Sequence, residues 1–372
     1  VDFLTQYVKT IILTDGSNGR IAVVPEYQGR VMTSSLEGDG GMSFGWLNRE
    51  LISSGKRLEN FNPYGGEDRF WLGPEGGQFS LFHKPGGPFD LGNWFVPDQI
   101  DILPYEVVDQ SESHLVFHAD FNVMNYSGTE FEIAVDRRIK MIPRKEAEEL
   151  LGIANSGDLD VVGYESENRI KNAGDSAWKK ETGLVSIWIL GMFSPGDNVT
   201  IIVPFYQGGT GSLGPVVNDT YFGKVPQERL HITEGVILFK GDGKYRSKIG
   251  LNWKRAKNVM GSYDEDRSVL TVVLYNKPEE EQLYIKSMWE IMDNPYNGDV
   301  INSFNDGPAT PGAKPLGPFY ELESSSPVKE LQPGEDLTHV HRTFHIQGNE
   351  SDLNNVCEKI FGIKLQVVRD VM

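Results

Sequence analysis

The chain has 372 residues, of which 39% are hydrophobic and 11% are aromatic, so it is long enough to bury a substantial core. Its formal net charge of −18 at pH 7 disfavours nucleic acid and anionic membranes as partners and favours a neutral or cationic one. The only cysteine, Cys357, excludes an intrachain disulfide and a cysteine cluster that could hold zinc or an iron–sulfur centre.

No apolar run approaches the ~20 residues that a membrane-spanning helix needs, so we expect no membrane span. The chain begins Val1-Asp-Phe-Leu, with neither an initiator methionine nor a recognisable signal peptide. If a signal sequence preceded it, we expect a periplasmic or extracellular location. The sequence otherwise indicates neither the compartment nor the oligomeric state.

Alternating apolar and polar residues predict short antiparallel strands through most of the chain. In His114–Val123, apolar side chains at every second position predict a strand with one buried face. Similar runs predict further strands at residues 20–24, 183–190, 200–205, 235–240 and 269–275. The 41 glycines and 20 prolines suit the many turns of an all-β protein.

Helices are expected to be few and short, at Phe3–Lys9, Arg144–Leu151 and Ser351–Phe361. The last has an apolar stripe at helical spacing, with Ser351 predicted as its N-cap and Gly362 as its C-terminal stop. Cys357 lies in that stripe, so we interpret it as a small core residue.

We expect a single domain that spans residues 1–372, because no low-complexity linker and no repeat interrupts the chain. Two Gly/Pro-rich stretches, Asn62–Gly87 and Asp306–Pro318, contain many aromatic and charged residues. We predict that they are long loops over a functional site.

The first candidate for ligand binding is the segment that contains Glu67, Asp68, Arg69 and Trp71. An aromatic ring packs on the C–H face of a pyranose, and charged planar groups form hydrogen bonds to adjacent hydroxyls, so this mixture is typical of a sugar site. The alternative for Arg69 is an ion pair with Glu67 or Asp68 inside a structural turn.

Two further segments supply polar candidates. Strand alternation directs Glu165, Glu167 and Arg169 to one face and Asn168 to the other, where its amide can both donate and accept hydrogen bonds. Asp306 lies beside the best candidate base, although an Asx-type turn alone would account for it.

The strongest candidate for chemistry is a strand that begins near Phe319, on which Glu321 and Glu323 share one face. Two carboxylates two positions apart repel each other unless a cation, a proton or a sugar hydroxyl lies between them. A raised pKa is expected for one of them, and this suits general acid–base catalysis near neutral pH.

Three histidines follow on the next predicted strand. Alternation places His339, His341 and His345 on one face, and Phe344 and Ile346 on the opposite face, which we predict to be the core-directed one. The His-x-His spacing also fits a transition-metal site, although we expect no bound metal and no cofactor. The alternative is that these histidines lie on the solvent-exposed face of an edge strand.

Three segments together resemble the galactose-mutarotase-like superfamily of aldose epimerases and related sugar-binding proteins. They are Gln28–Ser34, Gly65–Glu75 and Gly317–Pro327, and the likeness extends over nearly the full length, closest to an uncharacterised bacterial branch. The resemblance implies an all-β supersandwich of antiparallel sheets with a few short helices.

The resemblance also implies a mechanism and its residues. The epimerase base is a glutamate shortly before a Leu-x-Pro-Gly-Glu turn, and Leu331-Gln-Pro-Gly-Glu335 points to Glu323, with Glu321 as the second choice. In the family, the base removes the proton of the anomeric hydroxyl while a histidine protonates the ring oxygen, without a metal or cofactor. The two family histidine motifs are missing here, so His341 and His83 are the candidate acids.

Three functions follow from this reading. The first is an aldose 1-epimerase-like isomerase that acts on a free sugar with a glutamate base. The second is a non-catalytic carbohydrate-binding protein of the same fold that has lost the epimerase histidines. The third is glycoside cleavage by two carboxylates, drawn from Glu67, Asp68, Glu75 and Glu323. All three expect a small or oligomeric carbohydrate as the partner.

Overall fold

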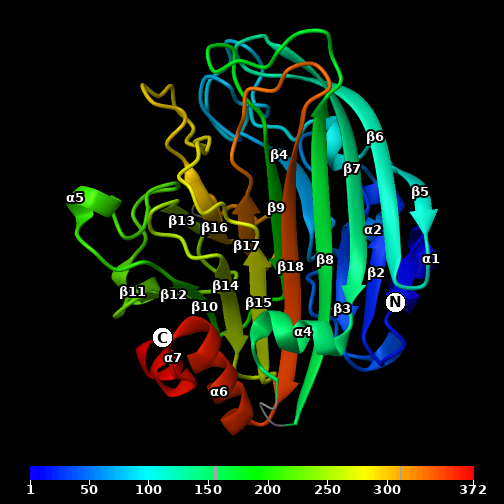
Figure 1. Ribbon diagram of the computed structural model, residues 1–372, viewed down its shortest axis with the longest axis vertical. Coiled ribbons are helices and arrows are strands. Elements are labelled where there is room, and N and C mark those ends of the chain that lie inside the picture. The colour runs from blue at the N-terminus through cyan, green and yellow to red at the C-terminus, as the bar shows by residue number, and fades with distance from the viewer. Residues whose placement is uncertain (155–157, 311) are drawn as a thin grey trace.

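The computed structural model describes residues 1–154, 158–310 and 312–372, in which antiparallel strands form three sheets (Figure 1). The expected all-β class is confirmed. The largest sheet contains, in spatial order, β11 (Leu230–Ile232), β12 (Val236–Lys240), β10 (Val199–Pro204), β14 (Val259–Asp264), β15 (Val269–Tyr275), β18 (Asp336–Gly348), β8 (Leu159–Asn172), β7 (Glu130–Ile142), β6 (His114–Met124) and β5 (Glu106–Gln110).

Two smaller sheets complete the strands. The first contains, in spatial order, β13 (Ser247–Asn252), β16 (Asp299–Asn305), β17 (Tyr320–Ser325), β9 (Ser186–Phe193) and β4 (Arg69–Gly73). The second contains β1 (Ile11–Thr14), β2 (Arg20–Val24) and β3 (Arg30–Ser35).

The helices of the described residues are short. The α-helices are α1 (Asp2–Tyr7), α2 (Arg49–Ser54), α3 (Asp98–Asp101), α4 (Arg144–Leu151), α5 (Thr210–Leu213), α6 (Glu350–Phe361) and α7 (Leu365–Val371). The 3₁₀ helices are η1 (Pro25–Tyr27), η2 (Gly38–Gly40) and η3 (Gln227–Arg229). None of these helices is long and apolar enough to cross a membrane.

Helix α6 covers the outer face of the ten-stranded sheet. Its buried side chains, Cys357 among them, belong to the same apolar cluster as Phe344 and Ile346 of β18. The N-cap is Asn349, whose side chain accepts a hydrogen bond from the Asp352 backbone N–H, so the predicted cap at Ser351 is wrong by two residues. The predicted stop at Gly362 is confirmed, since this glycine has φ +76°.

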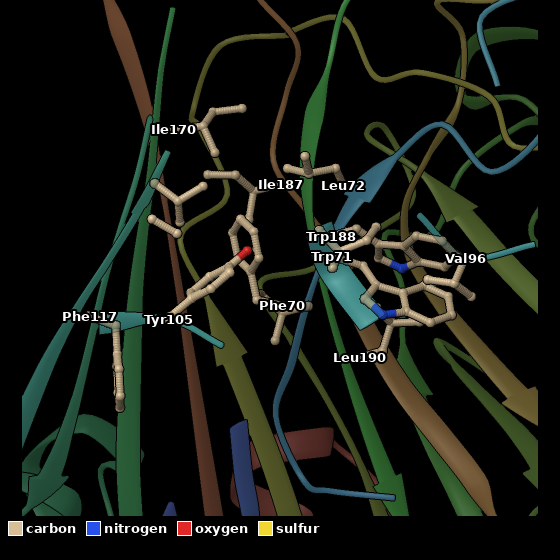
Figure 2. Close-up of a cluster of buried hydrophobic side chains, with 14 of the residues drawn as sticks. Phe70, Trp71, Leu72, Val96, Tyr105, Phe117, Ile170, Ile187, Trp188 and Leu190 are labelled. Atoms are coloured by element: carbon tan, nitrogen blue, oxygen red, sulfur yellow. The ribbon is translucent and has the colours of Figure 1, made fainter. Parts of the chain in front are cut away.

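The five-stranded sheet packs one face against the ten-stranded sheet, and alternation along each strand decides which side chains enter that interface. In Figure 2, Phe70 and Ile187 lie on the side of Tyr105 and Ile170, which belong to the interface between the sheets. Trp71 and Trp188 lie on the other side of the same two strands. The five-stranded sheet therefore has an outer face, directed away from the ten-stranded sheet, that is also rich in large side chains.

The sequence predicts that Asn62–Gly87 is a long loop, but part of this stretch forms a strand. It contains β4, an edge strand of the five-stranded sheet that pairs with β9 from Arg69↔Leu190 to Gly73↔Ser186. All five β4 residues are buried. The many glycines around this strand hide it from a pattern search, because they are typical of turns.

Candidate functional site

A pocket with a cavity volume of about 50 Å³ lies on the outer face of the five-stranded sheet. Strand β4 contributes Arg69 and Trp71 to it, and β9 contributes Trp188, Leu190 and Met192 at alternate positions.

Strand register explains how residues far apart in sequence meet in this pocket. One row across the sheet pairs Lys248 of β13 with Phe304 of β16, Phe304 with Glu321 of β17, and Glu321 with Met192 of β9. The next row pairs Glu323 with Leu190 and Leu190 with Arg69. Side chains that are paired or diagonal in an antiparallel sheet lie within contact distance.

Aromatic rings form most of the walls. The pocket is lined by Trp71, Trp94, Trp188 and Trp289, and by Phe61, Phe222, Phe304 and Phe319. Trp71 and Trp188 pack edge to face with their ring centroids 5.6 Å apart. Trp94 and Trp289 lie outside the five strands, and their rings stack with centroids 6.3 Å apart. Such rings give flat apolar surfaces with a polar indole edge.

The first charged pair in the pocket joins Arg69 and Glu321, which form a buried ion pair. The Arg69 guanidinium also lies over the Trp71 ring, 4.6 Å from its centroid. Burial raises the pKa of Glu321, nearby Glu323 raises it further, and Arg69 opposes both effects. A carboxyl group that takes up a proton more readily than usual therefore lines the pocket.

The second charged pair joins Lys248 and Glu323. The Lys248 ammonium lies 3.0 Å from Glu323 Oε2, which also accepts a hydrogen bond of 3.0 Å from the Trp188 indole N–H. Burial lowers the pKa of Lys248, but the negative charges of Glu323 and Glu75 outweigh burial and raise it. Glu323 is fully buried and Lys248 nearly so. Glu323 is thus fixed by two donors, with Oε1 left free of any described partner.

Several buried polar atoms around this pocket have no hydrogen-bond partner among the described residues. They are Arg69 Nε and Nη1, the indole nitrogens of Trp71, Trp94 and Trp289, and Glu323 Oε1. Leaving a buried donor or acceptor unpaired costs about 1–3 kcal/mol, so a group of them at one place needs an explanation. Polar hydroxyl groups of a ligand would supply the missing partners.

Glu67 and Asp68 lie outside this pocket, in the polar layer between the two large sheets. Glu67 is fully buried and accepts hydrogen bonds from Ser34, Tyr164 and His345. Burial raises the pKa of Glu67, but His345 and Ser34 outweigh it and lower the pKa. Both carboxylates are engaged by the protein itself, which removes them from the glycoside-cleavage hypothesis.

Arg137 connects two of the candidate residues inside that layer. Its guanidinium forms an ion pair of 2.5 Å with Asp68, at full burial of both side chains, and donates a hydrogen bond to the Asn168 side chain. The alternative weighed for Arg69, an ion pair with Glu67 or Asp68, is therefore wrong, since Arg69 pairs with Glu321 and Asp68 with Arg137. Asn168 is buried between the two large sheets, whereas the pocket lies on the outer face of the five-stranded sheet.

Asp306 lies near the pocket but does not line it. Its Oδ2 accepts a hydrogen bond of 2.8 Å from the Gly317 backbone N–H, which anchors the loop that carries Leu316 of the pocket wall. Burial raises the pKa of Asp306 to about 6. One of the two Asp306 oxygens therefore has a structural role, which is to hold this loop in place.

The three C-terminal histidines share one face of β18, as predicted, and this face points into the sandwich. His339, His341 and His345 are at most 1% exposed and β18 is a central strand, so the exposed-edge alternative is wrong. The opposite face, with Phe344 and Ile346, is also buried, which confirms its predicted core direction. The His339 Nε2 and His341 Nδ1 atoms lie 2.7 and 2.8 Å from Ser324 Oγ. One serine hydroxyl can donate to one neutral ring and accept from the other.

The two candidate acids differ in their position relative to Glu323. Glu323 and Ser324 are neighbours on β17 and point to opposite faces, so His341, which contacts Ser324, lies across the sheet from Glu323. His83 lies behind the pocket wall, with its ring centroid 5.2 Å from that of Trp289, and its Nδ1 is 3.1 Å from Ser80 Oγ. Among the described residues, no group of histidine, cysteine and acidic side chains has the geometry of a metal site.

The sequence reading missed Lys248, Arg246 and Trp188. The sequence does contain a signal for Lys248. This lysine lies on a buried strand, on the face opposite to Ile249 and Leu251, and a lysine is rarely buried unless it is paired. Trp188 gives no such signal, since both faces of β9 are apolar and buried.

The chain belongs to a family of unknown function, DUF6786, whose profile matches residues 1–372. A search of curated proteins found no match. The fold that the resemblance implied is confirmed, since solved structures of galactose mutarotase-like proteins share it.

Three of those structures share the fold over nearly the whole chain. The Slr1438 protein from Synechocystis sp. PCC 6803 is 14% identical, with a TM-score of 0.54 over 92% of this chain and 96% of its own. A candidate aldose 1-epimerase from Escherichia coli K12 is 11% identical, with a TM-score of 0.54 over 92% and 99%. A galactose mutarotase-like protein from Lactobacillus casei is 10% identical, with a TM-score of 0.51 over 91% and 100%. These values establish the fold.

Proposed function

We propose that the chain binds a free sugar of monosaccharide size in the pocket on the outer face of the five-stranded sheet. The observation that supports this most is the combination of aromatic walls with buried, unpartnered donors at Arg69, Trp71 and Trp94. A pyranose has an apolar C–H face for stacking and hydroxyl groups at its rim for those donors. A purely apolar ligand would leave the donors unpaired, which is costly.

Saturation-transfer NMR on a panel of free aldoses tests this proposal. We expect at least one aldose to receive magnetisation from the wild-type protein, and Trp94→Ala to weaken its binding by about tenfold or more because a stacking surface is lost. Trp178→Ala is the matched control, since Trp178 is also buried but does not line the pocket. The proposal fails if no aldose binds, or if the two variants behave alike.

An aldose 1-epimerase-like isomerase is the second candidate. Glu323 would remove the anomeric proton, and Glu321, whose pKa is raised by burial, would supply a proton to the ring oxygen. This assignment replaces His341, which faces the other side of the sheet, and keeps His83 as a reserve acid near Trp289. The observation that favours it is the presence of proton-transfer groups on a strand that lines the pocket.

Anomer exchange in the same NMR samples separates the two candidates. An isomerase accelerates exchange above the spontaneous rate, and Glu323→Gln abolishes the acceleration while sugar binding persists. Glu321→Gln should lower the rate as well if Glu321 is the acid, whereas His83→Gln should not. Binding without accelerated exchange would leave the non-catalytic carbohydrate-binding protein.

A further inference from the structure

Not every charged side chain that lines the pocket has an ion-pair partner among the described residues. Of the three cations that line it, Arg69 pairs with Glu321 and Lys248 pairs with Glu323. Arg246 forms no ion pair and no side-chain hydrogen bond with any residue that the structure describes. It precedes β13 directly, and its guanidinium lies 4.3 Å from the ring centroid of Phe222 and 5.7 Å from that of Phe304.

The carboxylates near Arg246 do not neutralise it by contact. Glu75, Asp306 and Glu321 are close enough to act on it electrostatically, yet burial still lowers the pKa of Arg246 below its usual value. Glu321 is held by Arg69, and Asp306 accepts a hydrogen bond from the Gly317 backbone. Glu75 also lines the pocket, and burial raises its pKa.

Arg246 is therefore the lining cation that lacks a direct ion-pair partner among the described residues, and it lies against aromatic rings. A guanidinium that is stacked on rings presents its N–H groups in a planar fork, and this fork fits the two oxygens of a carboxylate. A doubly charged phosphate fits less well, because its second charge would meet the carboxyl groups of Glu75 and Glu321, which line the pocket, without a further unpaired cation among the described lining residues. One unpaired guanidinium thus matches a ligand with one carboxylate.

We propose that the ligand is a sugar acid, a hexose-sized sugar that carries one carboxylate, and that Arg246 binds this carboxylate. The inference rests on the proposed function, since it places a sugar in the same pocket. It narrows the substrate class from neutral aldoses to uronic or aldonic acids. The protein has a net charge of −18, so its surface would repel a long polyanionic chain. A small ligand with one negative charge, bound by a cation inside the pocket, is consistent with this charge.

Titration calorimetry with glucuronate, galacturonate, their parent hexoses and glucose 6-phosphate tests the inference. We expect a hexuronate to bind the wild-type protein at least tenfold more tightly than its parent hexose. Arg246→Gln should remove that preference, so that a hexuronate and its parent hexose bind the variant with similar affinity, and Arg246→Lys, which keeps the charge but not the fork, should keep part of it. Lys244→Gln removes a nearby charge that pairs with Asp197 outside the pocket, so it should keep the full preference.

The outcomes separate this inference from the proposed function. Equal binding of hexose and hexuronate to the wild-type protein would overturn the carboxylate proposal and leave the sugar pocket intact, and this comparison requires no variant. Tighter binding of glucose 6-phosphate than of either uronate would overturn it as well. An equal loss of hexose and hexuronate binding in Arg246→Gln would make Arg246 a structural cation. If no sugar of any kind binds, the proposed function itself fails.

Discussion

At the scale of single residues, the buried histidines of β18 make stability depend on pH. Burial lowers the pKa of His339 to about 3 and that of His341 to about 4, from an ordinary value near 6.5. The folded state therefore holds both rings neutral. Their contribution to stability is complete above pH 6.5, and it is lost as the pH falls below 6.5 toward the folded values, because the unfolded chain binds protons more readily.

We predict that this pair accounts for a loss of about 2–3 kcal/mol in the free energy of unfolding between pH 6.5 and pH 5. Buried carboxyl groups with raised pKa values, such as Glu321, act in the opposite direction over this range. Urea denaturation of wild type and of His339→Gln at each pH separates the effects, since the carboxyl contributions cancel in the difference. The stability advantage of wild type should shrink as the pH falls. A pH-independent difference would contradict buried neutral histidines.

The sequence predicted which residues share a face of a strand, but not every face that is buried. The pattern of β17 correctly placed Glu321 and Glu323 on one face, because alternation is a local property of the strand. It could not indicate that the polar face of β18 is buried, since polar side chains normally face water. Only the facing five-stranded sheet, whose Ser324 contacts the two histidines, makes that burial tolerable.

At the scale of elements, the strands and helices with strong periodicity were predicted within a few residues. Strands β2 and β15 and helix α4 have the predicted bounds, and β6 extends the predicted strand by one residue. Strand β4 was missed because its flanking glycines are typical of loops, and its five residues are buried on both faces. Its pairing with β9 is a tertiary contact that local sequence does not encode.

The cap of α6 gives a direct test at this scale. The Asn349 side chain accepts a hydrogen bond of 3.0 Å from the Asp352 backbone N–H, so Asn349→Ala should lower the free energy of unfolding by about 1 kcal/mol. Ser351→Ala, two residues later on an exposed position, should change it by less than about 0.5 kcal/mol. Thermal denaturation of both variants measures the difference. A larger loss in Ser351→Ala would restore the cap that the sequence suggested.

At the scale of the whole molecule, the ten-stranded and five-stranded sheets share a buried polar layer. Glu67 joins β3, β8 and β18 through Ser34, Tyr164 and His345, and Arg137 joins β7 to Asp68. We propose on this ground that residues 1–372 form one domain. We predict one cooperative unfolding transition, with tryptophan fluorescence and far-UV circular dichroism giving the same midpoint. Two separated transitions would indicate independent domains.

The central claim is that the pocket on the outer face of the five-stranded sheet binds a sugar. The indole N–H signals of the seven tryptophans in a ¹⁵N-correlated NMR spectrum test it most directly, because four of them line the pocket and Trp178 and Trp253 do not. On titration with the tightest-binding sugar, we predict that the signals of Trp71, Trp94, Trp188 and Trp289 shift while those of Trp178 and Trp253 stay in place. Shifts confined to Trp178 or Trp253, with the four pocket signals unchanged, would contradict the account.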